Sequence, residues 1–213
     1  MIIRFEGAFE MDKGIRKKCQ ERFAAHKATL IQNTDRYLAI DWRDKDGRGD
    51  CYVNYILDKK RGSIIISGDL GDCIATWYNK MSVEDLKKYI GNVGYFMKKF
   101  QCTTDGYTLY DDDIMDDIRE QLKDFDIPEF IREGKLKYPF DFDDEDEFWQ
   151  TVENEICDSI RGRDFIPTEA LRETIGLIDG DYFEWLYNCG KRIHPRVYLW
   201  AVGFQMACEQ LGL

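Results

Sequence analysis

The first segment with a clear hydrophobic pattern runs from about residue 12 to residue 31. Ile15, Cys19, Phe23 and Leu30 recur there at roughly helical spacing, and basic residues occupy the other faces. The spacing predicts one amphipathic helix whose basic side faces the solvent.

The pattern changes between residues 37 and 79, where short segments rich in β-branched and aromatic residues are separated by turn signals. The separating segments combine Gly with charged residues, as tight turns do. We expect a four-stranded antiparallel meander with strands at 37–42, 51–57, 63–67 and 73–78 and turns at 46–50, 59–62 and 68–72.

Helical patterns dominate after the meander. Ser82, followed by Asp85 three residues later, is a capping signature that predicts a helix start. The segment 107–110 can add a strand. Helices are expected at 93–100, 112–124, 128–133, 144–160, 168–177, 181–188 and 195–209. The last of these is apolar on most sides, which indicates a central position in the core.

These elements predict an α+β fold. It consists of an N-terminal helix and a four-stranded antiparallel meander with covering helices, followed by a mainly helical C-terminal half. We expect an α+β meander domain over residues 1–138 and a helical region over residues 139–213, which can pack on the same core. No Gly/Ser/Pro linker forces a sharper division.

Composition narrows the class of protein. With 213 residues, of which 44% are hydrophobic and 14% aromatic, the chain can bury one sizeable core or two small ones, and it is not mainly disordered. No apolar run approaches the ~20 residues that cross a bilayer, and the chain does not start with a secretion signal. The 7 cysteines are scattered and form no CxxC pair, which fits reduced thiols in a core. We therefore expect a soluble cytoplasmic protein without a cofactor.

Charge is distributed unevenly. The formal net charge is −11, and residues 105–155 carry 19 Asp and Glu against 5 Lys and Arg, whereas the rest of the chain carries 22 against 25. Aromatic residues are interleaved with these acids, which indicates folded acidic surfaces and not a solvated tail. Basic residues gather between Lys13 and Lys27. The net charge disfavours direct nucleic-acid binding by the whole surface. A local basic patch can still bind nucleic acid on a chain whose net charge is negative.

The acidic segment partly matches a calcium-binding loop. Asp141, Asp143 and Glu145 have the required 1, 3, 5 spacing. However, Asp146 stands where the loop needs Gly, and Val152 stands where it needs a bidentate Glu. The match therefore fails, and we expect no calcium site here.

Histidine chemistry is also disfavoured. His26 and His194 are the only 2 histidines, and they lack the HxxxH spacing of zinc sites. We expect His26 on a helix surface and His194 at a helix start.

A recognisable pattern spans about residues 36–110. It reads Ile-Ile-Ser-Gly-Asp-Leu-Gly-Asp at 65–72, then Trp77, then a helix and Gly-Tyr-Phe-Met-Lys-Lys-Phe at 94–100. The pattern resembles uncharacterised proteins of bacteriophages and prophages. This resemblance implies a small phage accessory protein in the cytoplasm of a bacterial host, a class that includes inhibitors of CRISPR and of other host defences. It supplies no catalytic residue, and the acidic segment lies outside it.

The leading hypothesis is a non-enzymatic, acidic binding protein that acts as a nucleic-acid mimic. A duplex carries one negative charge per ~1.7 Å of its axis, so a basic groove attracts any rigid surface of comparable charge density. We expect the partner to be a basic, nucleic-acid-binding defence protein of the host, such as a CRISPR effector, with aromatic side chains adding apolar anchors. The residues predicted to contact it are Asp111, Asp112, Asp113, Asp116, Asp117, Asp141, Phe142, Asp143, Asp144, Glu145, Asp146, Glu147 and Trp149.

Three other interpretations stay open. The acidic residues can form an ordinary solvated face, which is what charge runs usually are. The chain can be a metal-dependent enzyme acting on nucleic acid or nucleotides through carboxylates such as Asp69 and Asp72 with those at 111–113. It can also bind nucleic acid through the basic segment from Lys13 to Lys27, with the acidic segment as an intramolecular cover. The oligomeric state is open.

Overall fold

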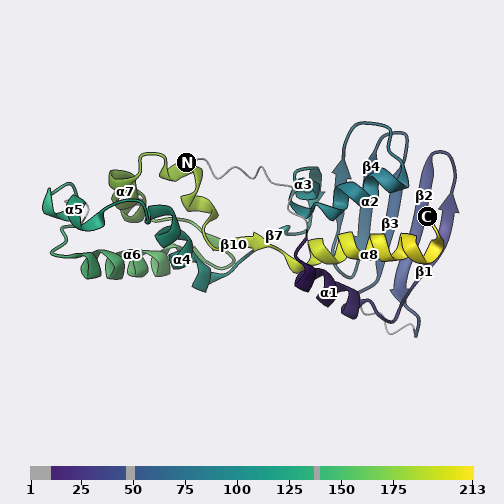
Figure 1. Ribbon diagram of the computed structural model, residues 1–213, viewed down its shortest axis with the longest axis horizontal. Coiled ribbons are helices and arrows are strands. Elements are labelled where there is room, and N and C mark those ends of the chain that lie inside the picture. The colour runs from purple at the N-terminus through teal and green to yellow at the C-terminus, as the bar shows by residue number, and fades with distance from the viewer. Residues whose placement is uncertain (1–10, 47–50, 137–139) are drawn as a thin grey trace. The chain divides into compact units, whose positions relative to one another are not determined.

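The computed structural model describes residues 11–46, 51–136 and 140–213. The chain forms two compact units (Figure 1). The first, here called the sheet unit, lies within residues 1–106 and 193–213, and the second, the helical unit, spans residues 107–192. The helical unit is therefore inserted into the chain of the sheet unit. The predicted boundary at 138/139 falls on residues outside the described ranges, and the units divide the chain elsewhere.

The sheet unit is built on a six-stranded antiparallel sheet whose strands follow their order in the chain. The strands are β1 (His26–Asn33), β2 (Tyr37–Asp44), β3 (Val53–Asp58), β4 (Ser63–Gly68), β5 (Cys73–Thr76) and β6 (Phe100–Thr103). The predicted meander is confirmed as β2 to β5, because period-2 alternation places every second residue on the buried face. The turns at 59–62 and 68–72 are also confirmed. Most of the turn expected at 46–50 lies outside the described residues.

Helices pack on one face of this sheet, and Figure 1 shows α2 and α8 lying across it. They are α1 (Lys13–Arg22), α2 (Val83–Gly91), α3 (Val93–Met97) and α8 (Pro195–Leu211). The central position predicted for the last helix is confirmed, since Trp200 and Phe204 are fully buried. The Tyr55 hydroxyl donates to the Trp200 carbonyl at 3.0 Å. Gly203 permits this approach, because a Cβ there would lie 2.5 Å from the Tyr55 oxygen.

Two predictions within the sheet unit are wrong. The helix expected over residues 12–31 ends at Arg22, and its second half is strand β1. His26 therefore lies in a strand, 7% exposed, and not on a helix surface, while Leu30 is 43% exposed. The apolar spacing matched a helix by coincidence, because pairing with β2 decides the structure of this segment. The helix expected over 93–100 ends at Met97, and strand β6 was not predicted.

The helical unit contains four α-helices among its described residues. They are α4 (Asp111–Leu122), α5 (Ile127–Arg132), α6 (Glu145–Ser159) and α7 (Glu169–Ile178). Two short strand pairs accompany them, β7 (Tyr107–Leu109) with β10 (Lys191–Ile193) and β8 (Ile160–Arg161) with β9 (Asp164–Phe165). The helix expected over 181–188 is instead two 3₁₀ turns, η1 (Tyr182–Glu184) and η2 (Leu186–Asn188). The unit has its own apolar core, centred on Ile114, Ile118, Phe148, Leu171 and Ile175.

The cysteines serve mainly as core residues, as the sequence predicts. All 7 are free thiols, and 5 of them are buried. Burial raises the pKa of the thiols of Cys73, Cys189 and Cys208 to about 12. These three thiols are therefore protonated and poorly nucleophilic at neutral pH.

Candidate functional site

The boundary between the two units is also a boundary of charge. The helical unit carries 25 Asp and Glu against 10 Lys and Arg, and the sheet unit carries 16 against 20. Folding therefore places the acidic excess on one compact body with its own core. Such a body presents its carboxylates at fixed positions, which a solvated tail does not.

The first acidic group lies at the start of α4. Asp111, Asp112 and Asp113 occupy its first turn, where negative charge complements the helix dipole. Tyr110 takes the N-cap position of α4, and no side chain forms a capping hydrogen bond there. Asp111 and Asp112 are exposed, as is Asp116 one turn later.

Asp113 and Asp117, one turn apart on α4, both pair with Arg192. The guanidinium donates to both carboxylate oxygens of Asp117, at 2.8 and 2.9 Å, and lies 3.0 Å from a carboxylate oxygen of Asp113. The backbone N–H of Gly190 also donates to Asp117, at 2.7 Å. Asp113 and Asp117 therefore join α4 to β10, and Asp117 also to Gly190 just before it, so both offer a partner little free charge. Their assignment to partner binding is a prediction that this geometry disfavours.

The same contacts set the pKa of Asp117. Partial burial raises this pKa, but the hydrogen bonds from Arg192 and from the Gly190 amide, together with the guanidinium charge, bring it below its ordinary value. A carboxyl group whose pKa is lowered by folding stabilises the folded state above its unfolded pKa of about 3.9. That contribution is lost as the pH falls through the lower, folded pKa.

Arg192→Gln is therefore expected to destabilise the helical unit in a pH-dependent way. At pH 7 we expect a loss of about 1 kcal/mol, a modest value because Arg192 keeps 41% of its side-chain exposure and part of its hydration. Below about pH 3.9 the difference from the unchanged chain should shrink as the pH falls, since the stabilisation that comes from the lowered pKa of Asp117 is lost there. Urea unfolding at pH 7 and at successively lower pH values measures this. Arg132→Gln, which removes an exposed guanidinium on α5, should show no such pH dependence.

The second acidic group surrounds the start of α6. The Asp144 carboxylate caps the helix by accepting the Glu147 amide at 2.9 Å, and Glu147 in turn accepts the Asp143 amide at 2.8 Å. Glu145 accepts the indole N–H of Trp149 at 3.0 Å. These three carboxylates fix the backbone and the neighbouring ring, so the helix start is a defined surface.

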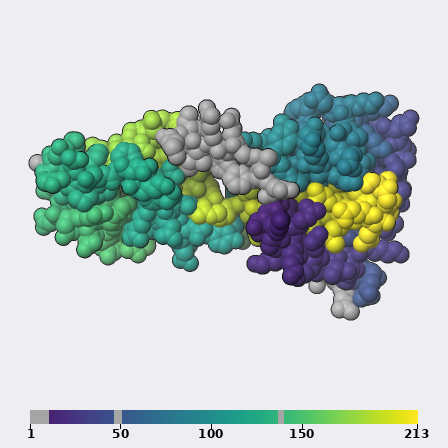
Figure 2. Space-filling model, viewed as in Figure 1, coloured from purple at the N-terminus to yellow at the C-terminus, as the bar shows by residue number. Residues whose placement is uncertain are grey.

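Three further carboxylates near the start of α6 are unpaired. Asp141, Asp143 and Asp146 are exposed. Within the described ranges, no Lys, Arg or His lies within ion-pair distance of them. We call Asp141, Asp143 and Asp146 the α6 patch, and Asp111, Asp112 and Asp116 the α4 patch. Figure 2 shows the surfaces of α5 and α6 next to each other in this unit, where the two helices make contact.

The aromatic anchors predicted beside these acids are mostly internal. Phe142 is only 6% exposed and packs edge-on against the fully buried Phe148, with ring centroids 5.4 Å apart. Burial disfavours the predicted contact of Phe142 with a partner, because the ring belongs to the core of the helical unit. Trp149 is half-buried, and the Arg119 guanidinium lies 5.4 Å from its ring centroid.

The contact between Arg119 and Trp149 also shows how the two patches are related. Arg119 lies late in α4 and Trp149 lies early in α6, so the last part of α4 lies beside the first part of α6. Asp111 is about 12 Å from Arg119 along the axis of α4. The α4 patch therefore lies on α4, and the α6 patch lies around the start of a different helix of the same unit.

One of the carboxylates considered for a metal site, Asp69, has a structural role. Asp69 accepts the Tyr52 amide at 2.9 Å and so holds the connection into β3. Within the described part of the chain, no three His, Cys, Asp or Glu side chains are placed to hold a metal ion. His194 caps α8 by accepting the Arg196 amide at 3.2 Å, which confirms its predicted place at a helix start.

No family model, curated protein or solved structure matches this chain. Among the residues that the structure describes, no helix combines the length and the apolar character needed to cross a membrane.

Proposed function

We propose that the helical unit binds the basic, nucleic-acid-binding groove of a partner protein and competes there with nucleic acid. The α6 patch is the observation that supports this proposal most directly. Asp141, Asp143 and Asp146 are exposed and unpaired there, and neighbouring carboxylates hold the helix start in place. Fixed charge of this kind loses little conformational entropy when it meets fixed cations. The excess of 25 acids over 10 bases in the unit supplies long-range attraction.

The type of partner follows from charge density. Grooves that bind nucleic acid are lined with Lys and Arg spaced for phosphates, so they are the surfaces best matched to clustered carboxylates. The resemblance of residues 36–110 to phage proteins favours a host-defence nuclease of the CRISPR type. In this proposal Trp149, half-exposed beside the α6 patch, supplies apolar contact at the edge of the interface.

The test is displacement of nucleic acid. A purified CRISPR effector is loaded with a fluorescein-labelled duplex, and anisotropy follows the release of the duplex as the full chain is added. We expect displacement that weakens with increasing salt. The variant Asp141→Asn/Asp143→Asn/Asp146→Asn should displace the duplex at least tenfold less well. It leaves the capping carboxylates in place, so its fold should be unchanged.

The matched control removes the same charge elsewhere in the helical unit, through Glu153→Gln/Asp158→Asn/Glu169→Gln, three exposed positions on α6 and α7. The control should displace the duplex nearly as well as the unchanged chain. Equal losses in the two variants would show that only net charge matters, as for an ordinary solvated face. A third variant, Asp111→Asn/Asp112→Asn/Asp116→Asn, measures the share of the α4 patch.

A further inference from the structure

Four connections of the sheet unit meet at one end of its sheet. The Lys59 amide donates to the Arg36 carbonyl at 2.7 Å, which joins the β3–β4 turn to the β1–β2 turn. The Trp77 and Met81 amides donate to Gly62 and Lys59, both at 2.8 Å, and so clamp the segment after β5 onto the β3–β4 turn.

The remaining connection joins α3 to β6 and is held by the Thr76 amide, which donates to the Lys99 carbonyl at 2.9 Å. Gly62 adds close contact, since a Cβ there would overlap the Asn79 carbonyl. The backbones of four separate segments are therefore held beside one another.

This end of the sheet is strongly basic. We call the basic side chains of the four connections the basic rim: Arg36, Lys59, Lys60, Arg61, Lys80, Lys98 and Lys99. The same segments contain only two acids, Asp35 and Asp58. The rim therefore concentrates positive charge on a chain whose net charge is −11.

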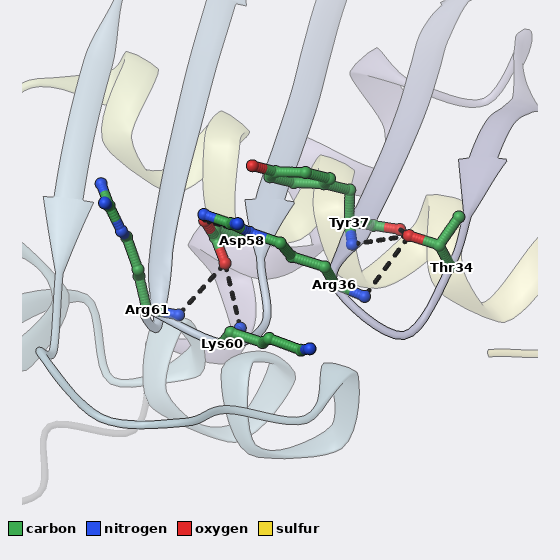
Figure 3. Close-up of polar contacts among 6 residues, drawn as sticks. All are labelled: Thr34, Arg36, Tyr37, Asp58, Lys60 and Arg61. Carbon is green, nitrogen blue, oxygen red and sulfur yellow. Dashed lines mark hydrogen bonds and ion pairs between the residues drawn. The ribbon is translucent and has the colours of Figure 1, made fainter.

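Asp58 does not neutralise the whole rim. One of its oxygens accepts the Arg36 guanidinium at 3.1 and 3.2 Å, and the other accepts the amides of Lys60 and Arg61 at 3.0 and 3.1 Å. Figure 3 shows the Lys60 and Arg61 side chains extending away from this carboxylate. Both are exposed, as are Lys80 and Lys98. For these four cations no carboxylate of the described residues is at ion-pair distance.

Tyrosine rings lie among these cations. Tyr78 is 75% exposed, and its backbone has φ of 59°, a conformation that bulky residues rarely adopt. Its hydroxyl donates to the Gln101 side chain at 2.8 Å, which fixes the ring while leaving it exposed. Two more rings have a cation over one face, with Arg36 4.9 Å from the centroid of Tyr37 and Lys99 4.8 Å from that of Tyr95.

We infer that the basic rim binds single-stranded nucleic acid. Clustered free cations attract a phosphate backbone, and exposed aromatic rings offer faces on which unpaired bases stack. In a duplex the bases are already stacked on one another, so an exposed tyrosine adds binding energy mainly with a single strand. An acidic protein would satisfy the cations but would gain nothing from the open face of Tyr78. This activity belongs to the sheet unit and is separate from the function proposed for the helical unit.

The test uses the full chain and a fluorescein-labelled oligothymidylate of about 15 nucleotides, with binding followed by anisotropy from about 50 mM salt upward. We expect binding that weakens with salt. Lys60→Gln/Arg61→Gln/Lys80→Gln should lower the affinity at least tenfold and reduce the slope of log K against log salt by about 2, since each phosphate contact contributes about 0.7.

The matched control is Lys13→Gln/Lys17→Gln/Lys18→Gln on α1, which removes three exposed cations from another face of the same unit. It should bind with nearly unchanged affinity and slope. Tyr78→Ala should weaken binding about tenfold, and Tyr78→Phe, which keeps the ring, by less than about threefold. Circular dichroism and the melting temperature confirm that each variant is folded.

Three results would overturn the inference. One is no binding of the oligonucleotide by the unchanged chain at low salt. Another is an equal or larger loss in the α1 control, which would assign binding to the basic helix. The third is self-association of the chain that depends on the rim cations, without oligonucleotide binding, which would make the acidic unit of a second copy the occupant.

Discussion

Trp200→Ala is expected to lower the free energy of unfolding of the sheet unit by about 3–5 kcal/mol. Trp200 is fully buried, and its ring lies 6.2 Å from that of Phe100 on β6. Its carbonyl also accepts the Tyr55 hydroxyl, which comes from β3. Truncation leaves a large cavity between α8 and the sheet, and neither element can shift far to fill it.

Urea unfolding combined with hydrogen exchange of peptides from β2, β3 and β4 measures this loss in the sheet unit alone. Ile31→Ala on β1 is the control, since Ile31 is 58% exposed and its truncation should cost no more than about 0.5 kcal/mol. A cost below about 1 kcal/mol for Trp200→Ala would mean that α8 does not complete the core of the sheet unit.

Gly190→Ala is expected to lower the free energy of unfolding of the helical unit by about 2–4 kcal/mol. Gly190 has φ of 72°, and a Cβ there would lie 2.5 Å from a side-chain carbon of Ile114 and 2.8 Å from the Tyr110 carbonyl oxygen. Its N–H donates to Asp117, and its carbonyl accepts the Tyr110 amide. Any shift that relieves the overlap therefore disturbs the start of α4.

Gly162→Ala separates the two causes of this loss. Gly162 has φ of 68°, close to that of Gly190, but nothing lies within 4 Å of the position of its missing Cβ. Gly162→Ala is therefore expected to lower the free energy of unfolding only through backbone strain, by about 1 kcal/mol. Thermal unfolding of the two variants compares them. Equal losses would show that Gly190 is needed for its backbone angle alone and not for close packing.

The sequence predicts the parts of the fold that depend on local pattern. Strands β2 to β5 follow from alternation and from Gly-containing turns, and α6 and α8 follow from capping residues and apolar spacing. The segment from His26 to Asn33 was predicted wrongly because its structure depends on pairing with β2. The return of residues 193–213 to the sheet joins segments far apart in the sequence, so no local signal predicts it.

For the candidate site too, the sequence predicts what depends on local pattern and misses what depends on contacts between distant residues. Acidic composition predicts where negative charge accumulates, and Asp141, Asp143 and Asp146 are indeed exposed. The pairing of Asp117 with Arg192 was not foreseen, because it joins residues that are 75 positions apart. The basic rim was also missed. The one local signal of the rim in the sequence is the run Lys59-Lys60-Arg61. Charged residues are common in tight turns, so this run alone does not predict a binding surface.

The insertion of the helical unit has a consequence for synthesis on the ribosome. The five strands within residues 26–76 emerge before α8, whose residues 195–211 complete the apolar core of the sheet unit. At about 5–20 residues per second, translation of residues 107–192 delays that helix by several seconds or more. During this interval the nascent sheet exposes apolar side chains such as Trp42 and Tyr55. We therefore expect chaperones of nascent chains to bind the sheet unit during the interval before α8 is made.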